Sequence, residues 1–280
     1  MRPSPHVLDL FAVPEDPQPL PGGQGFTVRA GDLVLSPDRD PGTQDWLSPL
    51  LARFAVRLDV DPARHPQDLR VAMPVPARDG SWVVDGWGAS RYEPGTVTCQ
   101  NLDVTIAAGH VLHARFASLV RERPAGLEGR TDRWSVAEQV AFGEAPVPRL
   151  RPAVHAWVTR ILASIDGPPP GPDQLVHRDL AGNVLLDAGG APVVIDVSPA
   201  WRPVLWADAV CVLDSVMWQG APVEVLDDWT SGPARNAMLR AAVFRLVSDD
   251  PDGPDDSDDS DGSDDLDVYL EAVGRLLVPA

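Results

Sequence analysis

Three polar residues that lie around short strand-like runs could together carry out phosphoryl transfer. Asp179 comes shortly after the run 174–176, Asn183 follows four residues later, and Asp196 ends the apolar run 193–195. When a phosphoryl group leaves a nucleotide, one carboxylate orients the attacking hydroxyl, while an amide and a second carboxylate hold the Mg²⁺ that bridges the phosphates. These residues therefore predict a magnesium-dependent site with Asp179 as its catalytic carboxylate.

Each of these residues also has a purely structural explanation. An Asp between a strand and a loop commonly caps a turn, but Asn183 and Asp196 close by favour the catalytic interpretation of Asp179. Mg²⁺ prefers oxygen ligands and usually takes only one or two from protein. Asp196 is harder to explain structurally, because an unpaired carboxylate at the end of a buried strand is costly. We therefore predict Asn183 and Asp196 as metal ligands.

The N-terminal third of the chain is predicted to be a small β-rich lobe. Residues 1–20 form a Pro-rich lead-in with little expected structure, and the lobe itself spans 21–95. Apolar residues at helical spacing predict one helix over 44–57. A glycine turn is expected to join two strands within 21–37.

A second pair of strands is predicted further along the same lobe. The β-rich stretches 69–74 and 82–87 lie on either side of Asp79-Gly80. An Asp-Gly pair between two such stretches is a hairpin signal. We therefore expect these two strands to pair with each other.

The rest of the chain, 96–280, is predicted to be a larger and mainly helical lobe. A strand is expected at 174–176, and the turn Asp187–Gly190 should join strands 184–186 and 193–195. Helical spacing of apolar residues predicts helices over 102–119, 154–165, 204–219, 233–247 and 266–277.

The order of His177, Asp179, Asn183 and Asp196 resembles the catalytic and metal-binding loops of the aminoglycoside phosphotransferase and protein-kinase-like superfamily. The segment 201–208, with its Trp-Arg-Pro and Trp-Ala-Asp triplets, resembles the segment C-terminal to these loops in some bacterial members. The resemblance implies an α+β, bilobal, protein-kinase-like fold with a small β-rich N-lobe and a larger, mainly helical C-lobe.

The resemblance also implies chemistry. His177 would support the loop backbone, Asp179 would serve the acceptor hydroxyl, and Asn183 with Asp196 would bind Mg²⁺. The expected cofactors are ATP or GTP and Mg²⁺, and the expected acceptor is a small molecule with a hydroxyl group. In the N-lobe, Gly22, Gly23, Gly25 and Arg29 are the candidate nucleotide-binding residues, because glycines allow close approach of phosphates.

The sequence departs from the superfamily pattern where it should bind phosphate. All 23 basic residues are arginines, so the strand lysine of kinases is missing, and Ser36 occupies its apparent position. Arg29 or Arg39 could supply the charge, although a guanidinium group needs a different approach geometry.

Two further departures concern the helix acid and the loop. The acid that pairs with the strand lysine has no Glu candidate, and only Asp45 could stand in. Asn183 follows Asp179 by four positions instead of the usual five, and Arg178 replaces the Gly usual in small-molecule phosphotransferases.

These departures leave two main functions open. The first is a phosphotransferase that uses Asp179, Asn183 and Asp196. The second is a catalytically inactive pseudokinase that acts as a binding or scaffold module, because fold does not imply function. A third, an interaction protein working through its Asp-rich segment, has the least support.

The net charge of −18 is concentrated near the C-terminus. Eleven aspartates lie between Asp249 and Asp267. We expect a solvated, disordered insertion at 249–265. The alternative, a calcium site, is rejected because the EF-hand spacing places Ser257 and Val268 where Asp and Glu are required. The negative charge argues against non-specific nucleic acid binding.

The remaining composition indicates a cytoplasmic protein. The sequence has no apolar run long enough to span a membrane, and its N-terminus lacks the apolar stretch of a signal peptide. Cys99 and Cys211 are isolated thiols without a disulfide or metal pattern. No membrane partner is therefore expected, and the sequence does not indicate an oligomeric state.

Overall fold

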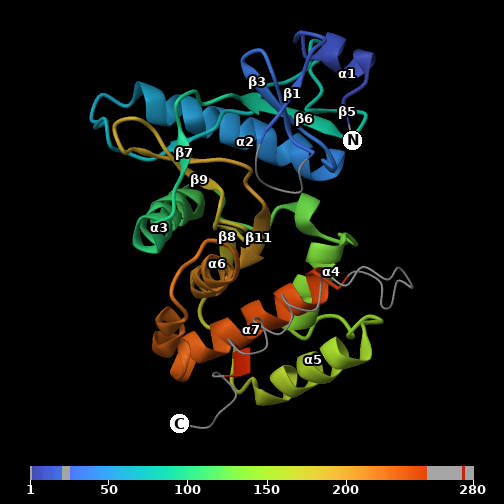
Figure 1. The fold of residues 1–280 in the computed structure, drawn as a ribbon, viewed down its shortest axis with the longest axis vertical. Coiled ribbons are helices and arrows are strands. Elements are labelled where there is room, and N and C mark those ends of the chain that lie inside the picture. Colours follow the sequence, from blue (N-terminus) through green and yellow to red (C-terminus); the bar gives the residue numbers. More distant parts are fainter. Residues whose placement is uncertain (1, 21–25, 251–272, 275–280) are drawn as a thin grey trace. The chain divides into compact units, whose positions relative to one another are not determined.

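The computed structural model describes residues 2–20, 26–250 and 273–274, which fall into two compact units. The first unit holds the described residues of Met1–Cys99, Pro124–Gly126 and Gly182–Asp196, and the second holds the others. The N-terminal part is rich in strands and the C-terminal part is mainly helical (Figure 1). The predicted α+β class is confirmed.

A five-stranded antiparallel sheet forms much of the first unit. Its strand order is β1-β2-β3-β6-β5, and every neighbouring pair is antiparallel. Alternating burial along β2 directs Val28 and Ala30 into a core that also contains Leu35 and Trp87. The strands are β1 (Gln18–Pro19), β2 (Val28–Ala30), β3 (Leu33–Ser36), β5 (Val83–Val84) and β6 (Trp87–Arg91).

The N-terminal lead-in is structured, so the expectation of little structure over residues 1–20 is wrong. Helix α1 (Pro5–Leu10) is capped at its N-terminus by Ser4, whose hydroxyl accepts a hydrogen bond from the Val7 N–H. Val7 and Leu8 are buried in the same core as the sheet. Burial of these apolar side chains orders a segment that its prolines suggested would be irregular.

Helix α2 (Pro41–Val60) extends beyond the predicted 44–57 at both ends. Asp40 caps its N-terminus by accepting a hydrogen bond from the Thr43 N–H at 2.7 Å. Pro41 occupies the first turn, where the missing N–H costs nothing. The cap and the proline start the helix at Pro41, three residues before the predicted start at residue 44.

The first unit also contains a mixed sheet of order β4-β10-β9-β7. Its β9–β10 pair is the antiparallel hairpin predicted around Asp187–Gly190, and the Asp187 N–H donates to the Ala191 carbonyl across the turn. β4 pairs with β10 in parallel, and β7 pairs with β9. The strands are β4 (Arg70–Val71), β7 (Val97–Thr98), β9 (Val184–Leu186) and β10 (Pro192–Val194).

The predicted hairpin at Asp79-Gly80 is wrong. Its first strand, β4, pairs with β10, while β5 turns back at Asp85-Gly86 to pair with β6. Asp85 and Gly86 both have positive φ, +49° and +81°, as a two-residue type I′ hairpin turn requires. The second Asp-Gly pair was therefore the hairpin signal, and the stretch 82–87 is a strand, a turn and the start of another strand.

The second unit is built around helix α7, which is buried along most of its length. α7 packs against α4, α5 and α6 (Figure 1). Trp206 of α6 and Phe244 of α7 meet edge to face with ring centroids 5.4 Å apart in its core. The helices are α3 (Leu102–Leu119), α4 (Arg133–Ala141), α5 (Pro152–Ser164), α6 (Val204–Trp218) and α7 (Gly232–Ser248).

A two-stranded antiparallel ribbon completes the second unit. It pairs β8 (Gln174–His177) with β11 (Pro199–Arg202). Short 3₁₀ helices occur at Ala125–Leu127 and Val223–Trp229.

In the C-terminal part of the chain, four of the predicted helices are confirmed and one helix was missed. α3, α5, α6 and α7 match predicted helices to within two residues at each end. α4 was missed because its short sequence mixes polar and apolar residues. Of the predicted helix 266–277 the structure describes only residues 273–274, which are helical, and most of the Asp-rich insertion 249–265 lies outside the described residues.

Two sequence-based expectations concern membrane-spanning segments and the two cysteines. Within them, no helix is long and apolar enough to cross a membrane. Cys99 and Cys211 are buried free thiols.

Candidate functional site

His177 organises the loop that carries Asp179 in the second unit. It is the last residue of β8 and is fully buried. Its Nδ1 atom accepts hydrogen bonds from the backbone N–H groups of Asp179 at 3.2 Å and Ser198 at 3.4 Å. Because both donors are N–H groups, Nδ1 carries no proton and the ring proton lies on Nε2. The buried imidazole thus fixes the backbone on which Asp179 is placed.

A second histidine supports the first. His113 on α3 is buried, and its Nε2 accepts a hydrogen bond from the backbone N–H of His177 at 3.0 Å. Burial, helped by the nearby His177 and His110, lowers the pKa of His113 to about 3. Gly109 allows α3 to pack closely against the loop, because a Cβ there would lie 2.5 Å from Cδ2 of Leu180 in the loop. α3 therefore holds the loop with a neutral imidazole.

We expect the stability of the protein to depend on pH through His113. Its pKa is about 3 in the folded state and about 6.5 in an unfolded chain. Below pH 6.5 the unfolded state takes up a proton that the folded state does not. The free energy of unfolding is therefore highest above pH 6.5 and should fall by about 2 kcal/mol between pH 7 and pH 5.

This expectation can be checked by urea unfolding at the two pH values. His113→Gln keeps an acceptor but does not titrate, so the variant should lose less stability than the wild type on acidification. His65→Gln, at an exposed histidine, is the matched control and should behave as the wild type. Equal pH dependence of the wild type and His113→Gln would contradict the assignment.

Asp179 is held by a buried arginine that the sequence did not single out. Arg245 of α7 donates from Nη2 to Oδ1 of Asp179 at 2.7 Å. The same guanidinium donates from Nε to Oδ1 of Asp214 on α6 at 2.8 Å, and its Nη2 also contacts Oδ2 of Asp214. The Asp179 side chain remains 45% exposed, whereas the Arg245 side chain is only 7% exposed. Asp179 is thus a solvent-accessible carboxylate with a fixed orientation.

The charges in this cluster are set by burial and by pairing. Burial alone would lower the pKa of Arg245, but the charges of Asp214 and Asp179 raise it well above its usual value. Arg245 is therefore always protonated. Burial raises the pKa of Asp214, and the Arg245 guanidinium opposes this shift. Without Arg245, Asp214 would be a buried carboxylate with no counter-charge among these residues.

Arg178, the residue between His177 and Asp179, has a structural role in this loop. Its buried guanidinium donates from Nη1 to Glu138 on α4 at 3.0 Å. Glu138 also accepts from Nε of Arg202 on β11 at 2.8 Å. Arg202 forms two further bonds, 2.7 and 2.6 Å long, to the carboxylate of Glu144. Glu138 therefore joins the loop to the segment 201–208 through two buried arginines.

The two predicted metal ligands lie together in the first unit. Asn183 directly precedes β9, and Asp196 follows β10 by two residues. The Ile195 N–H donates to the Asn183 carbonyl at 2.9 Å, which places both residues at the same end of the hairpin. Asp196 has a φ of +47°, a left-handed conformation that Asp tolerates better than most residues. An amide and a carboxylate at one end of a hairpin suit Mg²⁺, which takes few protein ligands.

Asp196 also forms an ion pair with Arg39 of the same unit. Nη1 of Arg39 lies 2.6 Å from Oδ1 of Asp196. Burial alone would lower the pKa of Arg39, but the charge of Asp196 and the hydrogen bond between them raise it. The Arg39 guanidinium therefore stays charged and brings a positive charge to the proposed metal ligand.

Of the predicted nucleotide-binding residues, the structure describes only Arg29. Gly22, Gly23 and Gly25 lie outside the described residues. Arg29 donates from Nε to the Gly31 carbonyl at 2.9 Å, and its guanidinium carbon lies 4.0 Å from the centre of the Tyr92 ring. Its role in nucleotide binding stays a prediction. Asp45, the suggested stand-in for the helix acid, lies on an exposed part of α2.

The predicted site residues are thus divided between the two units. His177 and Asp179 belong to the second unit, and Asn183 and Asp196 belong to the first. Sequence reasoning missed the residues that hold the loop. The available signal was a charged residue flanked by apolar residues within a predicted helix, as at Asp214 in α6 and Arg245 in α7.

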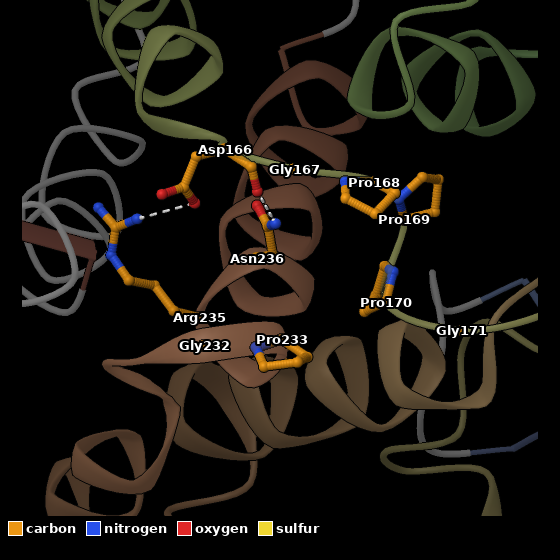
Figure 2. A pocket seen from close by; sticks show the side chains of 10 residues that line it. All are labelled: Asp166, Gly167, Pro168, Pro169, Pro170, Gly171, Gly232, Pro233, Arg235 and Asn236. Carbon is orange, nitrogen blue, oxygen red and sulfur yellow. Dashed lines mark hydrogen bonds and ion pairs between the residues drawn. The ribbon is translucent and has the colours of Figure 1, made fainter.

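A separate pocket of about 680 Å³ in the second unit contains none of these residues. It lies between the loop 166–171 and the start of α7 (Figure 2). The Asn236 amide donates to the Asp166 carbonyl, and Arg235 donates to the Ser164 carbonyl at 3.1 Å. These hydrogen bonds attach the loop to α7, so the polar side chains at the pocket have a structural role.

The fold of this chain is similar to the folds of solved structures. No protein-family model and no curated protein matches the sequence. Among solved structures, aminoglycoside phosphotransferase APH(4)-Ia is 18% identical over 97% of this chain and 95% of its own, with a TM-score of 0.55. The chain has a kinase-like fold. Choline kinase LicA from Streptococcus pneumoniae has the same fold, with 13% identity over 97% of this chain and 96% of its own and a TM-score of 0.50.

A further structure of the kinase-like fold contains ligands. A thermostable mutant of APH(4)-Ia, solved as a ternary complex with ADP and hygromycin B, is 17% identical over 97% of this chain and 95% of its own, with a TM-score of 0.53. The fold class expected from His177, Asp179, Asn183 and Asp196 is confirmed. At these identities the likeness establishes the fold alone.

Proposed function

We propose that the protein is a Mg²⁺-dependent phosphotransferase that moves the γ-phosphoryl group of ATP or GTP to a hydroxyl group of a small molecule. The observation that carries the proposal is Asp179, an accessible carboxylate that His177 and Arg245 hold in one orientation. A carboxylate fixed in this way suits the orientation of an attacking hydroxyl, where positioning matters more than basicity.

The second supporting observation is the pair Asn183 and Asp196. Their amide and carboxylate would hold Mg²⁺, which neutralises charge on the β- and γ-phosphates. Structures with the same fold contain ADP or AMP-PNP together with hygromycin B. These ligands support a nucleotide donor and a small hydroxyl-bearing acceptor for this chain.

In the proposed reaction, the γ-phosphoryl group moves from the nucleotide to the acceptor hydroxyl. The acceptor oxygen forms a bond to the γ-phosphorus while the bond from that phosphorus to the β–γ bridging oxygen breaks. Asp179 orients the hydroxyl and receives its proton. The products are a phosphorylated acceptor and a nucleoside diphosphate.

One observation favours a second candidate, a nucleotide-binding protein without transfer activity. Asp196 is engaged by Arg39 at 2.6 Å, so a metal ion at this carboxylate must compete with a guanidinium. A protein that keeps this pair closed would have the kinase-like fold without the chemistry. Turnover measurements separate this pseudokinase from the enzyme.

Thermal unfolding with AMP-PNP, with and without Mg²⁺, is the first test of the proposed function. We expect the unfolding midpoint to rise only when both are present, because ligand binding stabilises the folded state by about 1.4 kcal/mol at tenfold excess over Kd. The rise should disappear in Asp196→Ala and persist in Asp59→Asn, which alters an exposed carboxylate of the same unit. A wild type that shows no Mg²⁺-dependent rise would contradict the proposal.

Product formation then distinguishes the two candidates. ATP and GTP should each be tested with a panel of hydroxyl compounds that includes aminoglycosides and choline, as suggested by the proteins that share the fold. Transfer by the wild type that is lost in Asp179→Asn would establish the enzyme. Tight nucleotide binding with no transfer to any acceptor would favour the binding protein.

A further inference from the structure

The missing lysine leaves a phosphate-binding charge to be accounted for. Kinase-like sites use a lysine on the third strand to contact the α- and β-phosphates. This chain contains no lysine, and Ser36 is the last residue of β3. A serine hydroxyl is uncharged, so another residue of the first unit must supply the charge if the nucleotide is bound as proposed.

Arg39 lies three residues beyond Ser36, in the connection between β3 and α2. Its backbone N–H donates to the Gly86 carbonyl at 2.9 Å, which ties this connection to the β5–β6 turn. The Arg39 side chain is 24% exposed and reaches Asp196 at 2.6 Å. The guanidinium is thus anchored at its base and directed toward the proposed metal ligand.

The neighbouring strand provides space for this side chain. Gly88 of β6 is the cross-strand partner of Ser36. A Cβ at Gly88 would lie 3.1 Å from Cγ of Arg39 and 3.8 Å from its Cβ. The aliphatic part of Arg39 therefore lies directly over Gly88, where a larger residue would displace it. The absence of a side chain at Gly88 thus leaves room for an arginine that approaches from the connection beyond β3.

We infer that Arg39 binds the phosphates of the nucleotide in place of the strand lysine. This inference rests on the proposed function. Mg²⁺ held by Asp196 bridges phosphate oxygens, so a cation within contact distance of the same carboxylate is next to those phosphates. The forked guanidinium can donate two hydrogen bonds to phosphate oxygens. On this inference Arg39 would release Asp196 to hold the metal and would donate to the phosphates instead.

Arg57, an exposed arginine of α2 in the same unit, is the matched control. Arg29 is the other candidate for the phosphate-binding charge. Its guanidinium is used locally, in a hydrogen bond to the Gly31 carbonyl and in stacking on Tyr92. Arg39, in contrast, lies against the carboxylate that would hold the metal. Removing the charge of Arg39 and removing that of Arg57 change the net charge equally, so the comparison tests the position of the charge.

Calorimetric titration of AMP-PNP with Mg²⁺, and of adenosine, into four proteins tests the inference. We expect Arg39→Gln to weaken AMP-PNP binding by about 10- to 100-fold, the value of a charged hydrogen bond, and to leave adenosine binding unchanged. Arg39→Lys should recover part of the affinity, because the charge remains. Arg57→Gln should bind both ligands as the wild type does.

Three results would overturn the inference. The first is unchanged AMP-PNP affinity in Arg39→Gln, and the second is an equal loss of AMP-PNP and adenosine binding in both Arg39 variants. The third is tighter AMP-PNP binding in Arg39→Gln, which would show that Arg39 only blocks the metal site. Failure of the wild type to bind AMP-PNP with Mg²⁺ is a separate result, because it rejects the proposed function itself.

Discussion

Replacing Glu138 by Ala should lower the free energy of unfolding by about 3–5 kcal/mol, the usual cost of breaking a buried ion pair. Glu138 is buried and accepts hydrogen bonds from Arg178 at 3.0 Å and Arg202 at 2.8 Å. Both arginines are themselves buried. Removing the carboxylate leaves Arg178 to the more distant and more exposed Asp132, at 3.6 Å. The charge cannot be neutralised easily, because arginine stays protonated in proteins.

The control for this prediction is Glu144→Ala. Glu144 also binds Arg202, but its side chain is 44% exposed, and Arg202 keeps Glu138 as a partner. We expect a loss of about 1 kcal/mol or less, as for other exposed ion pairs. Urea unfolding of both variants gives the two values. A loss in Glu138→Ala that does not exceed the loss in Glu144→Ala would show that the buried network contributes little.

Replacing Arg245 by Met should lower the free energy of unfolding by about 3 kcal/mol at pH 7, because it removes one partner of a buried pair. Asp214 would then be a buried carboxylate that has lost its Arg245 counter-charge, with a pKa raised by burial. A carboxyl group with a raised folded-state pKa binds a proton that the unfolded chain releases, so its contribution to stability falls as the pH rises. The defect of the variant should therefore shrink as the pH is lowered from 7 to 5.

Unfolding of Arg245→Met at pH 5 and pH 7 tests this expectation. Adding Asp214→Asn should restore part of the stability at pH 7 and remove the pH dependence, because the buried charge is gone. A defect of the same size at both pH values would mean that lost packing, and not the unpaired carboxylate, causes it. The same variant also releases Asp179 from its 2.7 Å contact. If the proposed function holds, its kcat should therefore fall more than its nucleotide affinity.

The chemistry-bearing pattern and much of the secondary structure could be predicted from the sequence because they depend on neighbouring residues. Asp187–Gly190 is a short turn between two β-rich runs, so the hairpin that carries Asn183 and Asp196 follows from local turn chemistry. The apolar spacing in α3 and α5 similarly depends on residues three and four apart. Where a local signal was overlooked, as at Asp85-Gly86, the predicted pairing of β4 and β5 was wrong.

The partners of the site residues depend on long-range packing and were not predictable. Arg245 lies 66 residues from Asp179, and Glu138 lies 40 residues from Arg178. Arg39 meets Asp196 in a unit whose sheet pairs β4 with β10 in parallel. Such contacts form because buried charges require counter-charges and apolar faces require partners. Neither requirement tells which distant residue will satisfy it. Residue types and their spacing therefore indicate which groups are able to carry out the chemistry, whereas the packing of the helices and sheets selects the arginines and carboxylates that hold them in place.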